Sequence, residues 1–121
     1  MKLILAGLAL AAAPVLVSTA SADHRRHAFR YADTLAKDCQ SDVPALRGMC
    51  LGYLAAMSDA VEDAQDKGSQ SRRVCDPATV SLEDYRLALL GYLKDNPQQL
   101  KRPSSEVVTE AFSARWPCRK D

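Results

Sequence analysis

The sequence has 121 residues, with 16 Lys and Arg residues against 15 Asp and Glu residues, so its net charge at pH 7 is +1. A chain of this length is expected to form one small domain. Its basic residues form no cluster longer than Arg72-Arg73. This balance gives no electrostatic reason for nucleic-acid binding, and we expect no nucleic acid as partner.

Residues 1–22 have the pattern of a secretory signal peptide. Lys2 gives a positive start, an apolar run follows over residues 3–17, and Ala20-Ser21-Ala22 is an A-x-A cleavage site. The apolar run is too short to span a membrane comfortably, although an uncleaved anchor is the alternative. We therefore expect export through the Sec pathway, cleavage before Asp23, and a mature periplasmic chain of residues 23–121 without membrane association.

All four cysteines lie in the mature chain, at Cys39, Cys50, Cys75 and Cys118. An even number of cysteines in a small exported domain predicts two disulfides. A zinc site is the alternative, but the sequence has no CxxC pair. The two histidines, His24 and His27, form a weak metal-binding pair at best, and solvated side chains are the simpler interpretation. We expect no metal ion and no other cofactor.

No segment alternates polar and apolar residues as a strand would, so we predict an all-α domain of four helices. The first helix is predicted over residues 24–39. Its apolar face carries Phe29, Ala32, Leu35, Ala36 and Cys39. The second helix is predicted to be capped by Asp42, to hold Pro44 in its first turn and to end at Gly68.

The third helix has the clearest start in the sequence. Ser81 is the predicted N-cap and Asp84 occupies the third helical position, which together form a capping box. This helix is predicted to end at Asn96-Pro97, because the residue before a proline disfavours the helical conformation. The fourth helix is predicted to begin at 103–105 and to stop at Trp116.

The order of the helices predicts the cysteine pairing. The third and fourth helices are joined by a short connection and should pack antiparallel, which brings Cys75, before one helix, close to Cys118, after the other. By the same reasoning Cys39 at the end of the first helix faces Cys50 near the start of the second. We therefore predict the disulfides Cys39–Cys50 and Cys75–Cys118.

The second helix carries small residues at four-residue steps: Gly48, Gly52, Ala56 and Ala60. Each glycine lowers the stability of a helix interior by about 1 kcal/mol relative to alanine, so the stripe calls for an explanation. One interpretation is a close contact with the first or fourth helix of the same chain, with Gly52 at that contact. The other is the seam of a homodimer formed through residues 43–66.

The sequence contains no supported set of catalytic residues, so we expect a binding protein rather than an enzyme. Asp59 lies beside the apolar stripe of the second helix, and we expect it to pair with Arg30 or Arg86. The polar segment 66–74 is predicted to be an exposed loop, of the kind that reaches into the cleft of another protein. Its predicted partner-binding residues are Lys67, Gly68, Ser69, Arg72 and Arg73. The connection 94–103 is a second exposed segment that could contribute to an interface.

An ordered set of short motifs resembles the Rap/Tai immunity proteins associated with type VI secretion. The set comprises C-x-G-Y-L at 50–54, D-A at 59–60, C-x-P at 75–77, Y-L-x-x-x-P at 92–97 and W-P-C at 116–118. It extends over residues 35–118, and it departs from the expected pattern at Ala56, where a glycine is usual.

This resemblance implies a small, all-α, disulfide-bonded periplasmic protein, often dimeric, that binds a peptidoglycan amidase effector and occludes its active site. The alternative is a periplasmic stress or chaperone-like helical protein without a toxin partner. An effector gene beside this one would favour immunity. Acid-induced dissociation with exposure of apolar surface would favour the chaperone.

Overall fold

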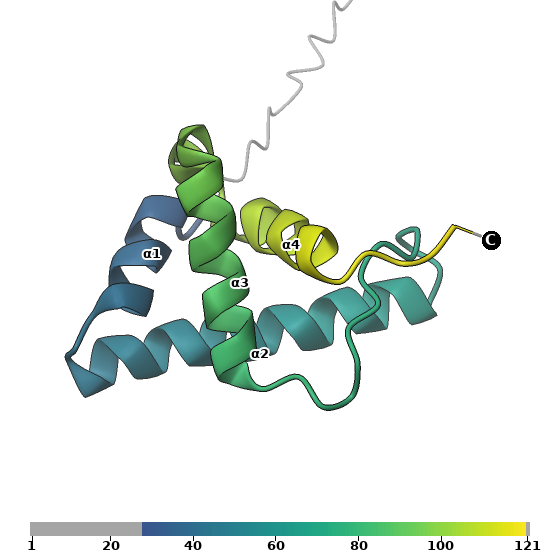
Figure 1. The fold of residues 1–121 in the computed structure, drawn as a ribbon, viewed down its shortest axis with the longest axis horizontal. Coiled ribbons are helices and arrows are strands. Elements are labelled where there is room, and N and C mark those ends of the chain that lie inside the picture. The colour runs from purple at the N-terminus through teal and green to yellow at the C-terminus, as the bar shows by residue number, and fades with distance from the viewer. Residues whose placement is uncertain (1–27, 121) are drawn as a thin grey trace, which may run out of the picture.

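The computed structural model describes residues 28–120 (Figure 1). Its elements are α1 (Ala32–Gln40), α2 (Pro44–Asp66), α3 (Leu82–Asp95), the short 3-10 helix η1 (Pro97–Lys101) and α4 (Ser104–Arg115). The predicted all-α domain of four helices is therefore confirmed. None of the described helices is both long and apolar enough to cross a membrane. The predicted signal peptide, His24 and His27 lie outside the described residues.

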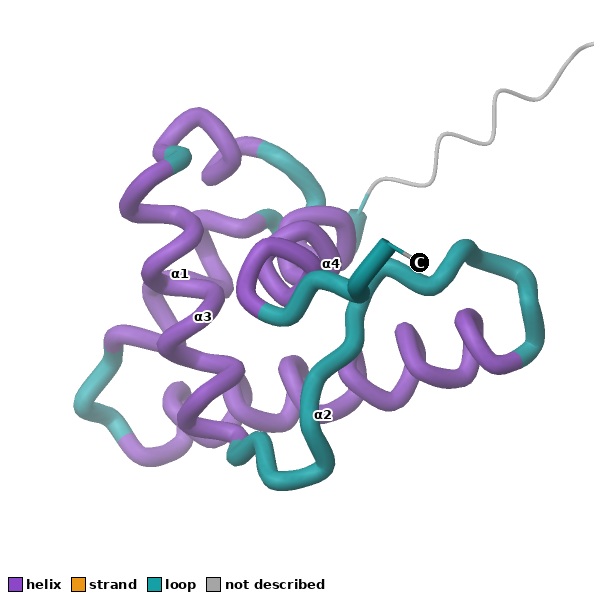
Figure 2. The backbone as a smooth tube through the Cα atoms, turned by 45° about the vertical axis from the view of Figure 1, so that its right-hand side comes forward, coloured by secondary structure: helices purple, strands orange, loops and turns teal. Residues whose placement is uncertain are grey.

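The longest helix, α2, is the base on which the other three α-helices pack (Figure 1). It contacts α1, α3 and α4, and α3 packs against α4 as predicted. The connection from α2 to α3 is the longest in the described chain and winds around the end of the domain near the C-terminus, where it is drawn in teal (Figure 2).

The core is built from one side of each α-helix. Its largest fully buried side chains include Leu35 of α1, Leu54 of α2, Leu89 of α3 and Phe112 of α4. An aromatic cluster closes the core where α3 meets α4. The ring of Tyr85 lies 4.6 Å from that of Phe112 and 5.2 Å from that of Trp116, measured between centroids. Aromatic pairs of this kind add about 0.5–1.5 kcal/mol each beyond the area they bury.

Several predicted helix ends are confirmed and one cap is wrong. The Asp84 N–H donates to Ser81 Oγ at 3.1 Å and the Ser81 N–H donates to Asp84 Oδ2 at 2.9 Å, which completes the capping box of α3. Pro44 begins α2, but the N-cap is Val43 and not Asp42. The side chain that bonds to the backbone before α2 is that of Ser41, whose Oγ accepts a hydrogen bond from the Val43 N–H at 3.1 Å.

The first helix begins later than predicted, at Ala32 rather than at residue 24. Residues 24–27 lie outside the described part, and residues 28–31 are not helical. The Ala32 N–H donates to the carbonyl of Arg102, and the Ser104 N–H donates to the carbonyl of Arg30, each at 3.0 Å. Because these backbone groups bond to the segment before α4, they are not available to a longer α1. Phe29, predicted on the apolar face, is fully exposed.

Both predicted disulfides are confirmed, and the described residues contain no free cysteine. Cys39 and Cys50 join the end of α1 to the second turn of α2. Cys75 and Cys118 join the segment before α3 to the segment after α4, as expected for an antiparallel pair.

The two glycines of the α2 stripe lie at no close contact with another described helix. Gly48, Gly52, Ala56 and Ala60 are all exposed. A Cβ atom added to Gly48 or Gly52 would have no neighbour within 4 Å. The interpretation as an intramolecular contact is therefore wrong, because α2 turns its opposite side, with Cys50 and Leu54, toward the core. The homodimer seam stays a prediction.

The expected ion pair of Asp59 is also wrong. Asp59 is exposed. Arg30 bonds instead to Asp38 at 2.6 Å, and Arg86 bonds to Glu83 at 2.5 Å. Hydrogen bonding to Arg86 lowers the pKa of the Glu83 carboxyl. Each arginine is thus paired with an acid other than Asp59: Arg86 with one on its own helix, and Arg30 with one near the end of α1.

We expect Gly52→Ala to raise the free energy of unfolding by about 0.5–1 kcal/mol, because alanine favours the helix and meets open space. Gly52→Leu should leave the fold of the single chain intact. The matched control is Ala111→Leu, which adds the same bulk in the buried core and should lower stability by about 1–3 kcal/mol. Denaturant unfolding measures all three, and a loss of stability for Gly52→Ala would contradict the exposed position of this residue.

Candidate partner-binding site

All five predicted partner-binding residues lie in one exposed loop after α2. Lys67 is the C-cap residue of α2, and the loop continues through residue 73 before the chain returns to the core at Val74. The loop is the outermost turn of the connection that Figure 2 draws beside the C-terminus. The structure therefore brings together Lys67, Gly68, Ser69, Arg72 and Arg73, each of them exposed.

The loop begins with a sharp turn at Gly68. Its φ angle of +70° lies in the left-handed region that glycine adopts at little cost. The Gly68 N–H donates to the carbonyl of Gln65 at 3.2 Å, and the Gln70 N–H donates to that of Ala64 at 3.1 Å. Ser69 Oγ donates to the Ala64 carbonyl as well, at 3.1 Å. These bonds satisfy carbonyls at the end of α2 and fix the direction in which the loop leaves.

The Gln65 side chain anchors the other end of the loop. Its Oε1 accepts hydrogen bonds from the backbone N–H groups of Arg73, at 2.8 Å, and Val74, at 2.9 Å. Its Nε2 donates to the carbonyl of Val74 at 3.1 Å. Gln65 is only 9% exposed, so these groups are satisfied by the protein rather than by water. Sequence reasoning missed this residue, although its four-residue spacing after Val61 places it on the buried stripe of α2.

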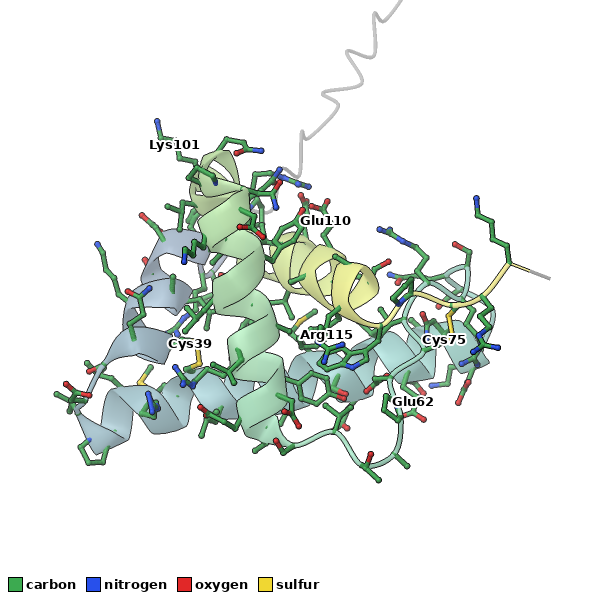
Figure 3. All side chains as sticks on the ribbon, in the orientation of Figure 1. Cys39, Glu62, Cys75, Lys101, Glu110 and Arg115 are labelled. Carbon is green, nitrogen blue, oxygen red and sulfur yellow. A yellow bond between two sulfur atoms is a disulfide. The ribbon has the colours of Figure 1, made fainter. Side chains whose placement is uncertain are left out.

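The segment after α4 holds the same end of the loop from a second side. Val74 forms an isolated antiparallel bridge with Pro117, and the Cys75 N–H donates to the carbonyl of Trp116 at 2.9 Å. Ser113 Oγ donates to the carbonyl of Arg73 at 3.2 Å. The disulfide from Cys75 adds a covalent link at this point (Figure 3). The loop is therefore an exposed turn between two fixed ends.

The three cations of the loop differ in their surroundings. Lys67 pairs with Asp63 at 2.8 Å, and Arg72 pairs with Asp66 at 2.5 Å. All four side chains are more than half exposed, so these pairs contribute little to stability and can exchange partners. Arg73 forms no ion pair with any described residue. Its backbone is fixed while its guanidinium is free to meet an acid from another molecule.

A groove of about 500 Å³ runs beside the loop, between α2 and α4. Its α2 wall is apolar, with Met57, Ala60 and Val61. Gln70, Ser71 and Arg73 line it from the loop. The opposite wall carries Arg102, Ser105, Glu106, Thr109 and Glu110. The groove extends the exposed surface of the loop across the neighbouring helices.

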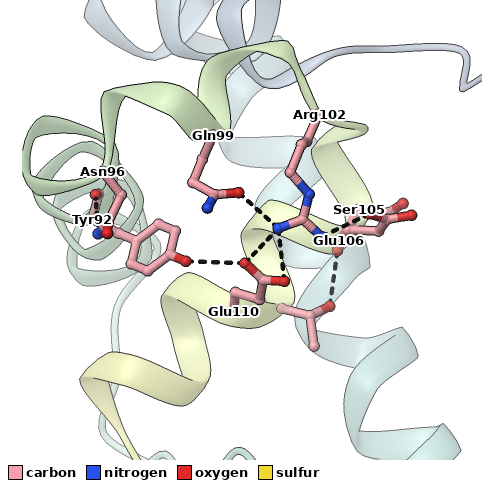
Figure 4. Close-up of polar contacts among 8 residues, drawn as sticks. Tyr92, Asn96, Gln99, Arg102, Ser105, Glu106 and Glu110 are labelled. Atoms are coloured by element: carbon pink, nitrogen blue, oxygen red, sulfur yellow. Dashed lines mark hydrogen bonds and ion pairs between the residues drawn. The ribbon is translucent and has the colours of Figure 1, made fainter.

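The charged groups on the opposite wall are hydrogen-bonded to one another (Figure 4). Arg102 donates to Glu106 at 2.8 Å, to Glu110 at 2.9 Å and to the side chain of Gln99 at 2.7 Å. Tyr92 donates its hydroxyl to Glu110 at 3.0 Å. Burial and this hydrogen bond raise the pKa of Tyr92. Because these groups are satisfied within the wall, Arg73 is the cation of the groove that is available to a partner.

A pocket of about 360 Å³ lies on the other side of the loop, at its junction with α3. Within it Tyr85 donates its hydroxyl to Asp76 and accepts a hydrogen bond from Ser58 Oγ at 2.9 Å. Burial raises the pKa of Tyr85 to about 12, so its hydroxyl stays protonated at neutral pH. These contacts tie the segment after the loop to α2 and α3.

The described residues contain no group of three or more His, Cys, Asp or Glu side chains placed to hold a metal ion.

We expect Gln65→Ala to loosen the loop, because it leaves two backbone N–H groups and one carbonyl near Val74 without partners. The two Val74 groups are buried, and a buried group without a partner costs about 1–3 kcal/mol, whereas the Arg73 N–H is only partly buried. Amide hydrogen exchange at Arg73 and Val74 should become faster, and trypsin should cleave after Arg72 and Arg73 more readily. The control is Gln70→Ala, which shortens an exposed glutamine of the same loop. Equal exchange rates in the two variants would contradict the anchoring role of Gln65.

Comparison with known proteins gives one match. The model of the family described as Rap1a immunity proteins matches residues 31–118, which include α1 to α4, the exposed loop and both disulfides. No curated protein and no solved structure matches the chain. The family match agrees with the ordered motifs of the sequence, and the chain belongs to the Rap1a immunity protein family.

Proposed function

We propose that the protein is a periplasmic immunity protein that binds a peptidoglycan amidase effector and occludes its active site. The observation that carries this proposal is the exposed loop of residues 67–73, which is fixed at both ends. Family membership supports an effector protein as partner. The amidase as target comes from the resemblance of the sequence motifs and is part of the proposal.

A loop with fixed ends suits insertion into an enzyme cleft. Binding by a mobile segment is weakened by the entropy lost when the segment becomes ordered, and a preorganised segment avoids most of that loss. Here Gly68 and Ser69 give the turn little bulk, and the bonds of Gln65 keep its ends in place. The small tip can enter a narrow opening while the groove beside it contacts the rim.

Recognition by the loop is electrostatic as well as steric. Lys67, Arg72 and Arg73 place three cations on the exposed loop, of which the first two are partly neutralised by Asp63 and Asp66. Such a loop speeds the association with an acidic partner and orients the encounter. Arg73 makes the strongest contribution, since no ion pair with a described residue has to be broken on binding.

The proposed compartment rests on the signal peptide predicted at residues 1–22 and on the disulfides. Disulfides persist in oxidising compartments such as the periplasm, which is also where a peptidoglycan amidase acts. The mature domain of residues 23–121 would meet the effector there. It acts by binding and carries out no reaction of its own.

The proposed homodimer uses the exposed side of α2. Gly48, Gly52 and Ala56 would let the α2 helix of a second copy approach closely, and the exposed Leu46 and Met49 would supply apolar contact area. This arrangement leaves the loop of residues 67–73 accessible in both copies, since the loop lies beyond the other end of α2.

We expect the mature protein to sediment as a dimer and Gly52→Leu to sediment as a monomer with unchanged helix content. The added side chain has room in the single chain but not between two closely packed helices. The matched control is Gly91→Leu, which adds the same bulk on the exposed side of α3. Analytical ultracentrifugation decides the matter, and a monomeric wild type would contradict the dimer.

We expect the protein to protect cells that send its cognate amidase, encoded by a neighbouring effector gene, to the periplasm. Arg72→Glu with Arg73→Glu should weaken binding to that amidase by about 10- to 100-fold, mainly through slower association. Growth and surface plasmon resonance provide the two readouts.

The matched control is Lys94→Glu with Lys101→Glu, which reverses the same number of charges on α3 and η1 and should bind normally. No protection by the wild type would reject the immunity function. Equal binding by the two charge-reversed proteins would reject the loop as the recognition element and leave the function itself in place.

A further inference from the structure

We propose that Cys75–Cys118 is a reducible latch on the partner-binding loop, whereas Cys39–Cys50 is a permanent part of the core. The role of the latch in partner binding rests on the function proposed above. The two bonds differ first in exposure. Cys39 and Cys50 are both fully buried. Cys75 is exposed and Cys118 is half-buried. The bonds also lie at opposite ends of the domain (Figure 3).

The buried bond is accessible only if the helices separate. Cys39 belongs to the last turn of α1 and Cys50 to the second turn of α2, and both sulfur-bearing residues belong to the core. The carbonyl of Cys39 also accepts a hydrogen bond from Arg86 of α3 at 3.0 Å. A reductant therefore reaches this bond only during unfolding that exposes the core.

The exposed bond joins two chain segments outside the helices. Cys75 directly follows Val74, where the loop ends, and Cys118 lies just beyond α4. We expect reduction to leave the core side chains of all four helices in place, together with the edge-to-face contact between Trp116 and Tyr85. It removes the covalent link between the end of the loop and the end of α4. The end of the loop near Val74 is then held by the hydrogen bonds of Gln65, Ser113 and the Cys75 backbone without a covalent link.

The reaction requires a dithiol, such as a thioredoxin-like reductase or dithiothreitol. One thiolate of the dithiol attacks the sulfur of Cys75. This attack forms a mixed disulfide between the reagent and Cys75, and it releases Cys118 as a thiolate. The second thiol of the reagent then attacks its own mixed-disulfide sulfur and releases Cys75. Two electrons pass from the dithiol to the protein, both cysteines take up protons, and the reagent becomes a disulfide.

The consequence is a loop that is fixed when oxidised and loose when reduced. A loosened loop must be ordered again on binding, so the reduced protein binds its effector more weakly. The protein would then be fully active in an oxidising compartment and weakly active in a reducing one. This regulation acts on the site itself and requires no change in the helical core.

The first test uses the purified, oxidised mature protein alone. It is treated with increasing dithiothreitol, alkylated, and mapped by mass spectrometry. We expect Cys75 and Cys118 to be labelled about tenfold faster than Cys39 and Cys50, since reactivity follows access to the bond. Circular dichroism should stay helical at the point where only the exposed pair is labelled. Simultaneous labelling of all four cysteines, or loss of helix on reduction of the exposed pair, would overturn the latch.

The second test measures the loop itself. Trypsin cleavage after Arg72 and Arg73 should become about tenfold faster in Cys75→Ser with Cys118→Ser, because cleavage follows the population of the open loop. The matched control, Cys39→Ala with Cys50→Ala, should leave cleavage of the loop unchanged at a temperature where it is folded. Unchanged cleavage in the serine variant would also overturn the latch. Neither test involves an effector, so failure of the proposed immunity function would not alter their outcome.

Discussion

One buried side chain, that of Gln65, connects the helical core to the exposed loop. It gives the backbone of Arg73 and Val74 the hydrogen bonds that a neighbouring strand would otherwise supply. The chain leaves α2, turns at Gly68 and returns to the core at Val74 within a few residues. If the Gln65 side chain were absent, this short return would bury backbone groups that have no hydrogen-bond partner. The bridge to Pro117 and the nearby disulfide strengthen an arrangement that this amide makes possible. The candidate site is therefore a consequence of how α2 ends.

The electrostatic character of the site also follows from local contacts rather than from the net charge. Acids on α2 partly neutralise Lys67 and Arg72, and the acids of the groove are occupied by Arg102. Arg73 is left as a cation with a fixed backbone and no competing acid among the described residues. A binding surface of this kind is selective because it offers one charge in a defined position, next to an apolar wall formed by α2.

Local sequence signals predicted much of the fold. The capping box of Ser81 and Asp84 and the proline in the first turn of α2 depend on neighbouring residues, and both are confirmed. The disulfides followed from helix order. The failures concern long-range contacts. The start of α1 depends on hydrogen bonds to residues 102–104, and the free side of α2 depends on where the other helices pack. The loop could be placed from its polarity, but the anchoring role of Gln65 required knowledge of which residues return to meet it.

The most direct test of this account is hydrogen exchange of the protein with and without its cognate effector. We expect the slowed exchange on binding to be concentrated in residues 67–74 and in the adjoining parts of α2 and α4 that line the groove. Unchanged exchange in this loop, with protection elsewhere, for example on the exposed side of α3, would contradict it.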